Sequence, residues 1–148
     1  MATKKIEGTH VFLVLWKSYR ALSRVAEESM ERVGLCSSDF RVLEALLHKG
    51  PLPVNVIGEK VELTTGSITT AVDRMESKGL VMRRLHEEDK RVRLVELTAK
   101  GRKLIEKAFA EHAADMEQAA GILSREERTT LVSLLKKLGL SAGTHDAK

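Results

Sequence analysis

The sequence predicts a mainly α-helical fold, α+β by strict count, and three observations support this class. Apolar residues recur at intervals of three and four along most of the 148 residues, which is the spacing of one helix face. Aliphatic and charged residues dominate: 43% of the side chains are hydrophobic but only 3% are aromatic, and turn signals are few. One pair of short β segments, around a charged turn, interrupts the helical pattern. We therefore expect a single chain unit, 1–148, with long helices at both ends of a smaller central unit.

The first helix is expected over residues 10–33. Apolar side chains recur there at helical spacing, and the segment ends at Gly34. Val11, Val14 and Val25 add apolar surface beyond one helix face. A first helix this apolar is expected to be buried against more than its own domain.

Three shorter helices should follow, from Ser37 or Ser38 to Lys49, over residues 53–61 and over residues 65–78. Serine at the start of the first can cap it. Pro53 suits the first turn of the second, because proline lacks the N–H that is unpaired there. Thr64 is suited to cap the third. Helices in such close succession form a trihelical helix-turn-helix unit.

Two strands joined by a charged tip come next and complete a winged helix-turn-helix over residues 37–97. Arg83 and Arg84 lie on the first strand, the tip runs from His86 to Arg91, and the chain returns through Arg93. This hairpin is the expected wing.

Two further helices close the chain, over residues 99–120 and 125–138. Thr98 can cap the first, and Ser124 with Glu127 three residues later forms a capping box for the second. From Gly139 onward the residues are small and polar, so we expect a frayed tail.

The long terminal helices, 10–33 and 99–138, cannot bury their apolar faces on one small domain, so they are predicted to be dimerisation helices. Leu131, Leu134, Leu135 and Leu138 form one such face. A symmetric homodimer would bury these faces and hold two reading heads at a fixed separation, as a palindromic operator requires.

Composition argues against several other classes. The longest apolar stretch, Val11 to Trp16, is far shorter than the roughly 20 residues of a membrane span. Lys4 and Lys5 are not followed by the long apolar region of a signal peptide. A single cysteine fits a reducing compartment. We therefore expect a cytoplasmic protein with no membrane partner.

The charge is concentrated near the predicted wing. Residues 74–103 contain ten Lys and Arg against five Asp and Glu, although the net charge of the whole chain is only +4. A local basic footprint is typical of nucleic-acid binding, although a solvated charged hairpin explains the charge equally well.

The helix over 65–78 favours nucleic acid over that alternative. Ile68, Val72 and Met75 share its inward face, which leaves hydroxyl-bearing side chains outward. The predicted DNA contacts are Thr64, Thr65, Ser67, Thr69, Thr70, Arg74, Arg83, Arg84, Asp89, Lys90, Arg91 and Arg93.

Three sequence blocks resemble the MarR family of bacterial transcriptional regulators. They are G-L-C-S-S-D-F-R-V-L at 34–43, L-T-T-G-S-I-T-T-A-V-D-R-M-E-S-K-G-L-V at 63–81 and E-D-K-R-V-R-L-V-E-L-T-A-K-G at 88–101. The D-K-R followed by L-T-x-x-G is the most specific part. The G-S-I-T-x-x-V-D pattern also resembles the branch of the family that responds to quinones and hydroquinones.

The resemblance implies roles for individual residues. It implies that Thr64 to Arg74 enter the major groove and that Arg91 enters the minor groove, oriented by Asp89, while Lys90 and Arg93 contact phosphate. It further implies a cytoplasmic bacterial protein that is nucleoid-associated when bound to DNA. Redox-sensing relatives carry a cysteine near the start of the first helix, where this chain has residues 12–14, Phe-Leu-Val, so that mode of sensing does not transfer.

Small aromatic ligands are the effectors that the resemblance suggests. Trp16 and Tyr19, with Phe40, are the candidate aromatic wall for a phenolic or quinone-like ligand; the alternative is that they pack in the dimer core. For Cys36 we favour core packing over a thiol-based redox sensor, because buried cysteine is usually inert.

Other chemistries have no support in the sequence. The histidines, His10, His48, His86, His112 and His145, show no metal-ligand spacing, so we predict no metal and no cofactor. No nucleophile–base motif or phosphate-binding loop is present, which argues against an enzyme.

The sequence therefore predicts a homodimeric regulator that binds double-stranded DNA, a repressor released by a small aromatic ligand. The alternative from another class is a winged-helix protein-interaction module that does not bind DNA. The basic tip from Lys90 to Arg93 favours DNA, because a protein-binding wing would more often expose apolar side chains.

Overall fold

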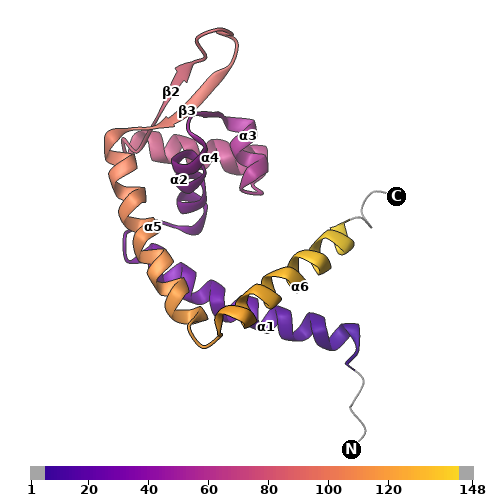
Figure 1. The fold of residues 1–148 in the computed structure, drawn as a ribbon. Helices are drawn as coiled ribbons and strands as arrows, with labels where there is room; N and C mark the ends of the chain where they lie inside the picture. The colour runs from indigo at the N-terminus through magenta and orange to yellow at the C-terminus, as the bar shows by residue number, and fades with distance from the viewer. Residues whose placement is uncertain (1–5, 144–148) are drawn as a thin grey trace, which may run out of the picture.

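The structure is a computed structural model and describes residues 6–143. The helices are α1 (Gly8–Glu31), α2 (Ser37–Lys49), α3 (Val54–Lys60), α4 (Thr65–Ser77), α5 (Ala99–Ala120) and α6 (Arg125–Gly143); the strands are β1 (Leu52–Pro53), β2 (Val81–Leu85) and β3 (Arg93–Leu97). The predicted fold class, a winged helix-turn-helix between long terminal helices, is confirmed (Figure 1).

The sheet has three strands in the order β1-β3-β2, all antiparallel, and the sequence pattern revealed only two of them. Leu52 pairs with Val95 and Pro53 pairs with Leu94. Pro53 was expected inside the first turn of α3, but it lies in β1 and precedes the first helical residue, Val54. Proline is tolerated in β1 because this strand is at the edge of the sheet.

The core of the molecule lies inside the winged unit. It is formed by one face each of α2, α3 and α4, by the sheet and by the first turns of α5; its largest fully buried side chains are Phe40, Leu43, Leu46, Ile57, Ile68, Met75 and Ile105. Packing against this core is what keeps the seven-residue α3 helical, since so short a helix is not stable alone.

The segment L-T-A-K-G joins the wing to α5 by close backbone contact. The Thr98 hydroxyl accepts from Gly101 N at 3.0 Å and donates to Gly79 O at 2.6 Å, while Thr98 N donates to Leu80 O at 3.1 Å. A Cβ at Gly101 would lie 1.8 Å from Leu80 O. The L-T-x-x-G motif therefore sets the angle between the wing and α5.

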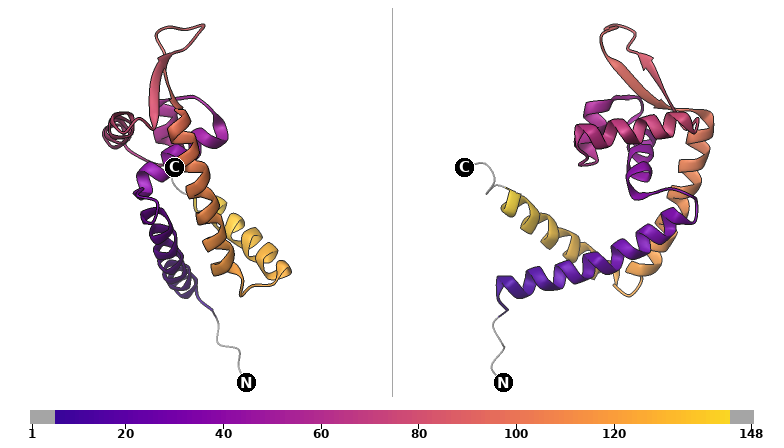
Figure 2. Two further views of the ribbon diagram at one scale, coloured as in Figure 1. Left: turned by 90° about the vertical axis from the view of Figure 1, so that its left-hand side faces the viewer. Right: turned by 180° about the vertical axis from the view of Figure 1, so that it is seen from behind.

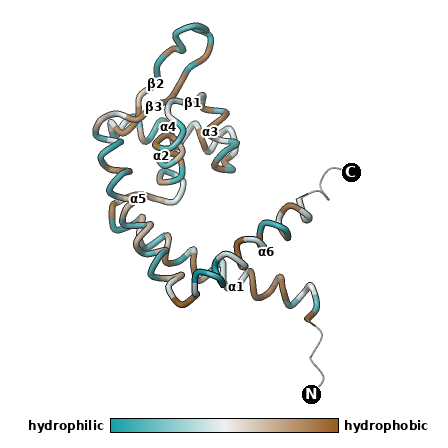
Figure 3. The backbone as a smooth tube through the Cα atoms, viewed as in Figure 1, coloured by the Kyte–Doolittle hydropathy of each residue, from teal (hydrophilic) through white to brown (hydrophobic). Residues whose placement is uncertain are grey.

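The arms are defined here as α1 and α6, and they contrast with this core. The C-terminal end of α1 packs against α5, where the buried Ser29 Oγ lies 3.0 Å from His112 Nδ1 and Arg32 pairs with Asp115. The rest of α1 and all of α6 diverge from the molecule, with α1 and α6 on opposite sides of α5 (Figure 2). Hydrophobic residues recur along both helices (Figure 3), and several of their large side chains are exposed, among them Phe12, Leu134 and Leu138.

The predicted fraying from Gly139 is wrong as far as Gly143, because α6 continues to that residue. A glycine inside a helix is tolerated when good helix formers such as Leu138 and Leu140 flank it. Residues 144–148 lie outside the described part of the chain. Within residues 6–143 no helix is both long and apolar enough to cross a membrane.

Candidate nucleic-acid interface

The candidate recognition helix is α4, and its start is fixed by a cap. Thr64 Oγ1 accepts a hydrogen bond from Ser67 N at 3.2 Å, as an N-cap residue should. Ile68, Ala71, Val72 and Met75 are buried, so the opposite face of α4 is exposed to solvent. The predicted outward residues on that face, Thr65, Ser67, Thr69 and Thr70, are all exposed.

Arg74 was predicted to point outward without a partner in the chain, but its guanidinium is bound to Asp39. Its Nε donates to Asp39 Oδ2 at 3.2 Å, its Nη2 donates to Asp39 Oδ1, and Nη2 lies 3.8 Å from Cys36 Sγ. The hydrogen bond to Asp39 raises the pKa of the Arg74 guanidinium above its ordinary value. Because Asp39 is only 1% exposed, this pair ties the middle of α4 to the start of α2.

Sequence reasoning placed Arg74 by helical phase alone and did not consider Asp39. A carboxylate at the N-terminal end of a helix is usually explained by the helix dipole. The available signal was helical spacing: Asp39 lies three residues before Val42 and four before Leu43, on the buried face, where a carboxylate needs a cation.

Arg83 and Arg84 also bind carboxylates of this chain. Arg83 Nη2 donates to Asp73 Oδ1 at 2.6 Å and Nη1 pairs with Glu76, both on α4. Arg84 Nε donates across the hairpin to Glu96 Oε2 at 2.8 Å. Both guanidinium groups are partly buried, so the basic balance counted along residues 74–103 overstates the positive charge facing solvent.

The wing tip is ordered by a small hydrogen-bond network. His86 Nδ1 accepts from Glu88 N and Asp89 N at 3.2 Å each, and Val92 N donates to Asp89 O at 3.0 Å. This role of His86 was not among the sequence-based predictions, in which the residue figured only as a rejected metal ligand. A histidine at the start of a tight turn was the signal that could have indicated it.

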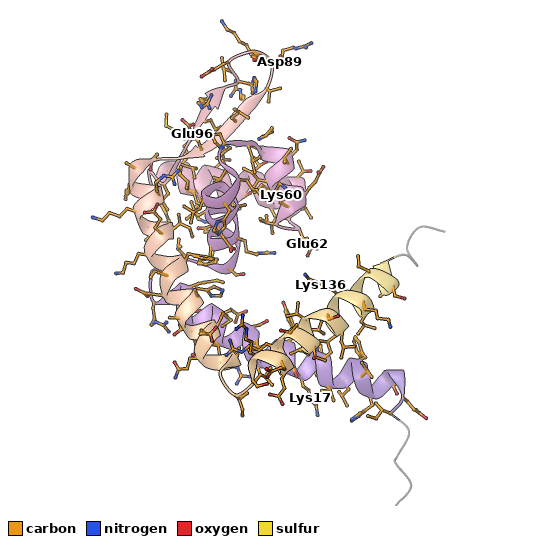
Figure 4. The ribbon with its side chains drawn as sticks, in the orientation of Figure 1. Lys17, Lys60, Glu62, Asp89, Glu96 and Lys136 are labelled. Atoms are coloured by element: carbon orange, nitrogen blue, oxygen red, sulfur yellow. The ribbon has the colours of Figure 1, made fainter. Side chains whose placement is uncertain are left out.

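Asp89 holds Arg91 at the far end of the hairpin, where Figure 4 labels Asp89. Asp89 Oδ1 accepts from both Arg91 N and Arg91 Nε at 3.1 Å. These hydrogen bonds from Arg91 lower the pKa of the Asp89 carboxyl. The Arg91 side chain is 92% exposed, and the neighbouring Lys90 and Arg93 are exposed as well.

A cleft of about 450 Å³ brings the two predicted halves of the interface together. Thr65 and Thr69 line it from α4, Arg91 and Arg93 line it from the wing, and Asn55 lines it from α3. Asn55 was not among the predicted site residues. Its polar, exposed side chain beside two arginines makes it a further candidate contact.

The predicted aromatic wall is not assembled within one chain. Trp16 is 45% exposed, Tyr19 is exposed as well, and the Arg20 guanidinium lies 5.0 Å from the centre of the Trp16 ring. Phe40 is 1% exposed and stacks on His112, with ring centroids 5.1 Å apart. Phe40 therefore belongs to the core of the winged unit, and its prediction as a ligand contact is wrong.

Cys36 was expected in the core, and this expectation is wrong. The thiol is exposed at the N-cap of α2, with Sγ 3.2 Å from Ser38 Oγ. The adjacent Leu35 occupies the buried position instead. Within residues 6–143 no cluster of His, Cys, Asp and Glu is placed to hold a metal ion, and His145 lies outside this range.

Comparison with known sequences gives a consistent result. The sequence profile of the MarR family matches residues 35–92. The HTH-type transcriptional regulator MhqR of Bacillus subtilis is 38% identical over 132 residues, which cover 89% of this chain and 91% of MhqR. The HTH-type transcriptional repressor MdtR of the same organism is 32% identical over 119 residues, covering 80% of this chain and 77% of MdtR.

Solved structures share the fold. A MarR family protein from Bacillus stearothermophilus superposes with a TM-score of 0.78 at 27% identity, covering 91% of this chain and 94% of that one. A mutant of MarR from E. coli in complex with operator DNA gives 0.76 at 24% identity, covering 86% and 92%. BpsR of Bordetella bronchiseptica, whose DNA binding is regulated by 6-hydroxynicotinic acid, gives 0.77 at 22% identity, covering 91% and 97%.

Proposed function

The chain belongs to the MarR family of transcriptional regulators, and on that premise we propose that it binds palindromic double-stranded DNA as a homodimer and represses transcription. It would act in the bacterial cytoplasm, on the nucleoid.

One observation carries the proposal: the exposed face of α4 and the arginines of the wing line the same cleft. An α-helix fits the major groove, and an extended arginine fits the narrower minor groove beside it. Hydroxyl groups on α4 and guanidinium groups on the wing are the side chains that contact base edges and phosphates. This arrangement favours DNA over the protein-interaction alternative.

The homodimer is supported by the arms. Large hydrophobic side chains on α1 and α6 are exposed in the single chain, among them Phe12, Leu134 and Leu138. Burial of these faces between two copies would give an extensive apolar interface, of the kind found in obligate dimers. Two α4 helices related by a dyad would then read two half-sites about one helical turn apart.

The binding prediction is tested with the DNA upstream of the protein's own coding region. In a gel-shift assay Arg91→Ala should weaken specific binding by about 1–3 kcal/mol, because a guanidinium in a narrow minor groove is lost. Lys136→Ala, a charge change on α6 far from the wing (Figure 4), is the matched control and should bind normally. Unaltered operator affinity in Arg91→Ala would remove the wing from the interface.

Release by a small aromatic ligand is the second part of the proposal. Trp16 and Tyr19 expose aromatic surface on α1, and the partner protomer can complete a pocket around them. The shared fold with BpsR, which responds to an aromatic acid, supports a ligand of this class, and the repressor MdtR supports repression. The ligand must bind the misaligned state of the two reading heads better than the aligned state, since equal binding shifts nothing.

A thiol-based sensor is the competing mechanism of release. It is favoured by one observation: the exposed Cys36 Sγ lies 3.8 Å from a guanidinium nitrogen of Arg74, which in turn holds α4. The two mechanisms predict opposite results in an operator-release assay with hydroquinone and with the corresponding quinone, to which a thiol can add without an oxidant. If the ligand binds non-covalently, Cys36→Ser still responds and Trp16→Ala does not; if the thiol is the sensor, the reverse holds.

A further inference from the structure

The middle of α4 presents an unusual set of groups to the solvent. Gly66, Thr70 and Asp73 lie opposite the buried face, and Thr69 flanks them on the side of the wing cleft. We call these four residues the outward stripe. On the other side, Ser67 and Arg74 face Ser38 of α2.

The two threonines of the stripe use their hydroxyl protons inside the helix. Thr69 Oγ1 donates to Thr65 O at 2.9 Å, and Thr70 Oγ1 donates to Gly66 O at 2.9 Å. What each presents outward is a methyl group and oxygen lone pairs. Each can therefore accept a hydrogen bond or make an apolar contact.

Asp73 is likewise a hydrogen-bond acceptor, because a carboxylate cannot donate. It receives one from Arg83 at 2.6 Å and remains exposed. The arginines that could have supplied donors, Arg74 and Arg83, are bound to Asp39 and to Asp73 and Glu76. The sequence of α4 contains no Lys, Asn or Gln, and its other exposed hydroxyls near the stripe, on Thr65 and Ser67, lie to either side of it. The outward stripe itself therefore consists of acceptors and methyl groups.

Gly66 adds a second, independent observation. A Cβ built there meets nothing within 4 Å, and the backbone does not adopt a positive φ. Neither packing nor conformation therefore requires glycine, although glycine inside a helix destabilises it relative to alanine. A bare backbone position on the exposed side of a helix is expected where another molecule approaches closely.

Guanine and adenine require different hydrogen-bonding groups on a protein surface that contacts them in the major groove. In the major groove guanine offers only acceptors, N7 and O6, and needs a donor such as arginine. An A·T pair offers the adenine N6 amino group, which needs an acceptor, and the thymine methyl group, which needs an apolar contact. The outward stripe can supply the acceptor and the apolar contact that an A·T pair needs, but not the donor that guanine needs.

We propose that α4 recognises A·T base pairs, through thymine methyl groups and adenine amino groups, with Gly66 allowing close approach of the helix to the bases. This rests on the proposed function, because it assumes that α4 enters the major groove. Cytosine, which also offers an amino group but no methyl group, is the second choice of the stripe. Arg74 and Arg83 are positioning residues in this scheme: they hold α4 and do not read bases.

The decisive experiment alters single atoms of the operator. The protected half-site is first mapped by footprinting with the full-length protein and natural DNA. Uracil then replaces thymine at each position, which removes only the methyl group, and 7-deazaguanine replaces guanine, which removes only N7. We expect uracil to weaken binding by about fourfold for each contacted methyl, and 7-deazaguanine to leave it unchanged.

Matched variants connect the DNA change to the protein. Thr69→Ser and Thr70→Ser remove the methyl group and keep the hydroxyl, whereas Thr69→Val and Thr70→Val keep the methyl group and remove the oxygen. A serine variant at the contacting position should bind thymine and uracil operators equally. The corresponding valine variant should still discriminate between them.

Gly66→Ala supplies a test with two readouts. The melting temperature of the free protein should stay the same or rise, since alanine is the better helix former, while operator affinity should fall at least tenfold. Unchanged affinity would remove Gly66 from the interface.

The outcomes separate this inference from the proposed function. If the natural operator is not bound specifically at all, the proposed function fails. If it is bound specifically but uracil has no effect while 7-deazaguanine weakens binding, the protein reads guanine and the inference is overturned.

Discussion

The winged unit and the arms use the same kinds of residue and reach opposite results. In the winged unit apolar side chains from α2, α3, α4 and the sheet converge on one core, where residues such as Leu43 and Val72 have no exposed surface. In α6, a helix of 19 residues, no residue is buried, although its leucines are spaced as regularly as those of α2. Only the C-terminal end of α1 is buried, at Ser29 and Met30.

The difference shows that periodicity predicts a helix but not what the helix packs against. A stripe of leucines is stable in water only when another apolar surface covers it. The winged unit contains its own covering surface, whereas in the proposed homodimer the arms receive theirs from a second copy. The two regions should therefore respond differently to equivalent substitutions.

The largest effect is expected from a charge placed in the apolar face of α6. Leu134→Asp would bury an unpaired carboxylate in the proposed interface and weaken dimerisation by about 3–5 kcal/mol. Sedimentation equilibrium measures the change. The winged unit, which α6 does not cover, should retain its hydrogen-exchange protection.

The control is Ser133→Asp, which adds the same charge on the polar side of α6 and should leave the dimer intact. A well-folded wild-type monomer at micromolar concentration would contradict the contrast between the two regions.

The same substitution, glycine to alanine, can be made at one position in each region to compare them directly. In Gly101→Ala the new Cβ would lie 1.8 Å from Leu80 O, so the wing and α5 must move apart, at a cost of about 3 kcal/mol of unfolding free energy. Gly139→Ala meets nothing within 4 Å in α6 and should stabilise the helix by about 0.5–1 kcal/mol. Urea denaturation of both variants gives the two values, and equal effects would mean that the junction yields easily.

A small effect, confined to DNA binding, is expected at the wing tip, which belongs to the winged unit but lies outside its core. Asp89→Asn weakens the orientation of Arg91, so operator affinity should fall by about two- to tenfold. The melting temperature should not change, since the tip is exposed. A loss as large as that of Arg91→Ala would mean that the carboxylate itself contacts DNA.

The pKa of Asp89 gives a related expectation about pH. Because Arg91 lowers this pKa, the carboxylate is charged at neutral pH, and its contact with Arg91 is lost only as pH falls through the lowered value. Operator affinity should therefore show no pH dependence arising from Asp89 between about pH 6 and pH 8. Plots of operator affinity against pH for the wild type and for Asp89→Asn should run parallel over that range.

The sequence by itself determined the fold class, the order of the helices and the wing, because each depends on local patterns. The Thr64 and Thr98 caps were readable since they depend on residues three positions apart. The exposure of Thr65, Ser67, Thr69 and Thr70 followed from helical phase alone.

The tertiary structure decided everything that depends on a partner distant in the chain. The pairing of Arg74 with Asp39, 35 residues away, makes a residue predicted only as a DNA contact a link between α2 and α4. The short strand β1 exists because β3 offers it an edge, and its two residues carry too little pattern to be found alone. Cys36 is exposed because the adjacent Leu35 occupies the buried position before α2, a choice that no local pattern indicated. Ion pairs, edge strands and burial depend on three-dimensional proximity, which the spacing of residues along one chain does not contain.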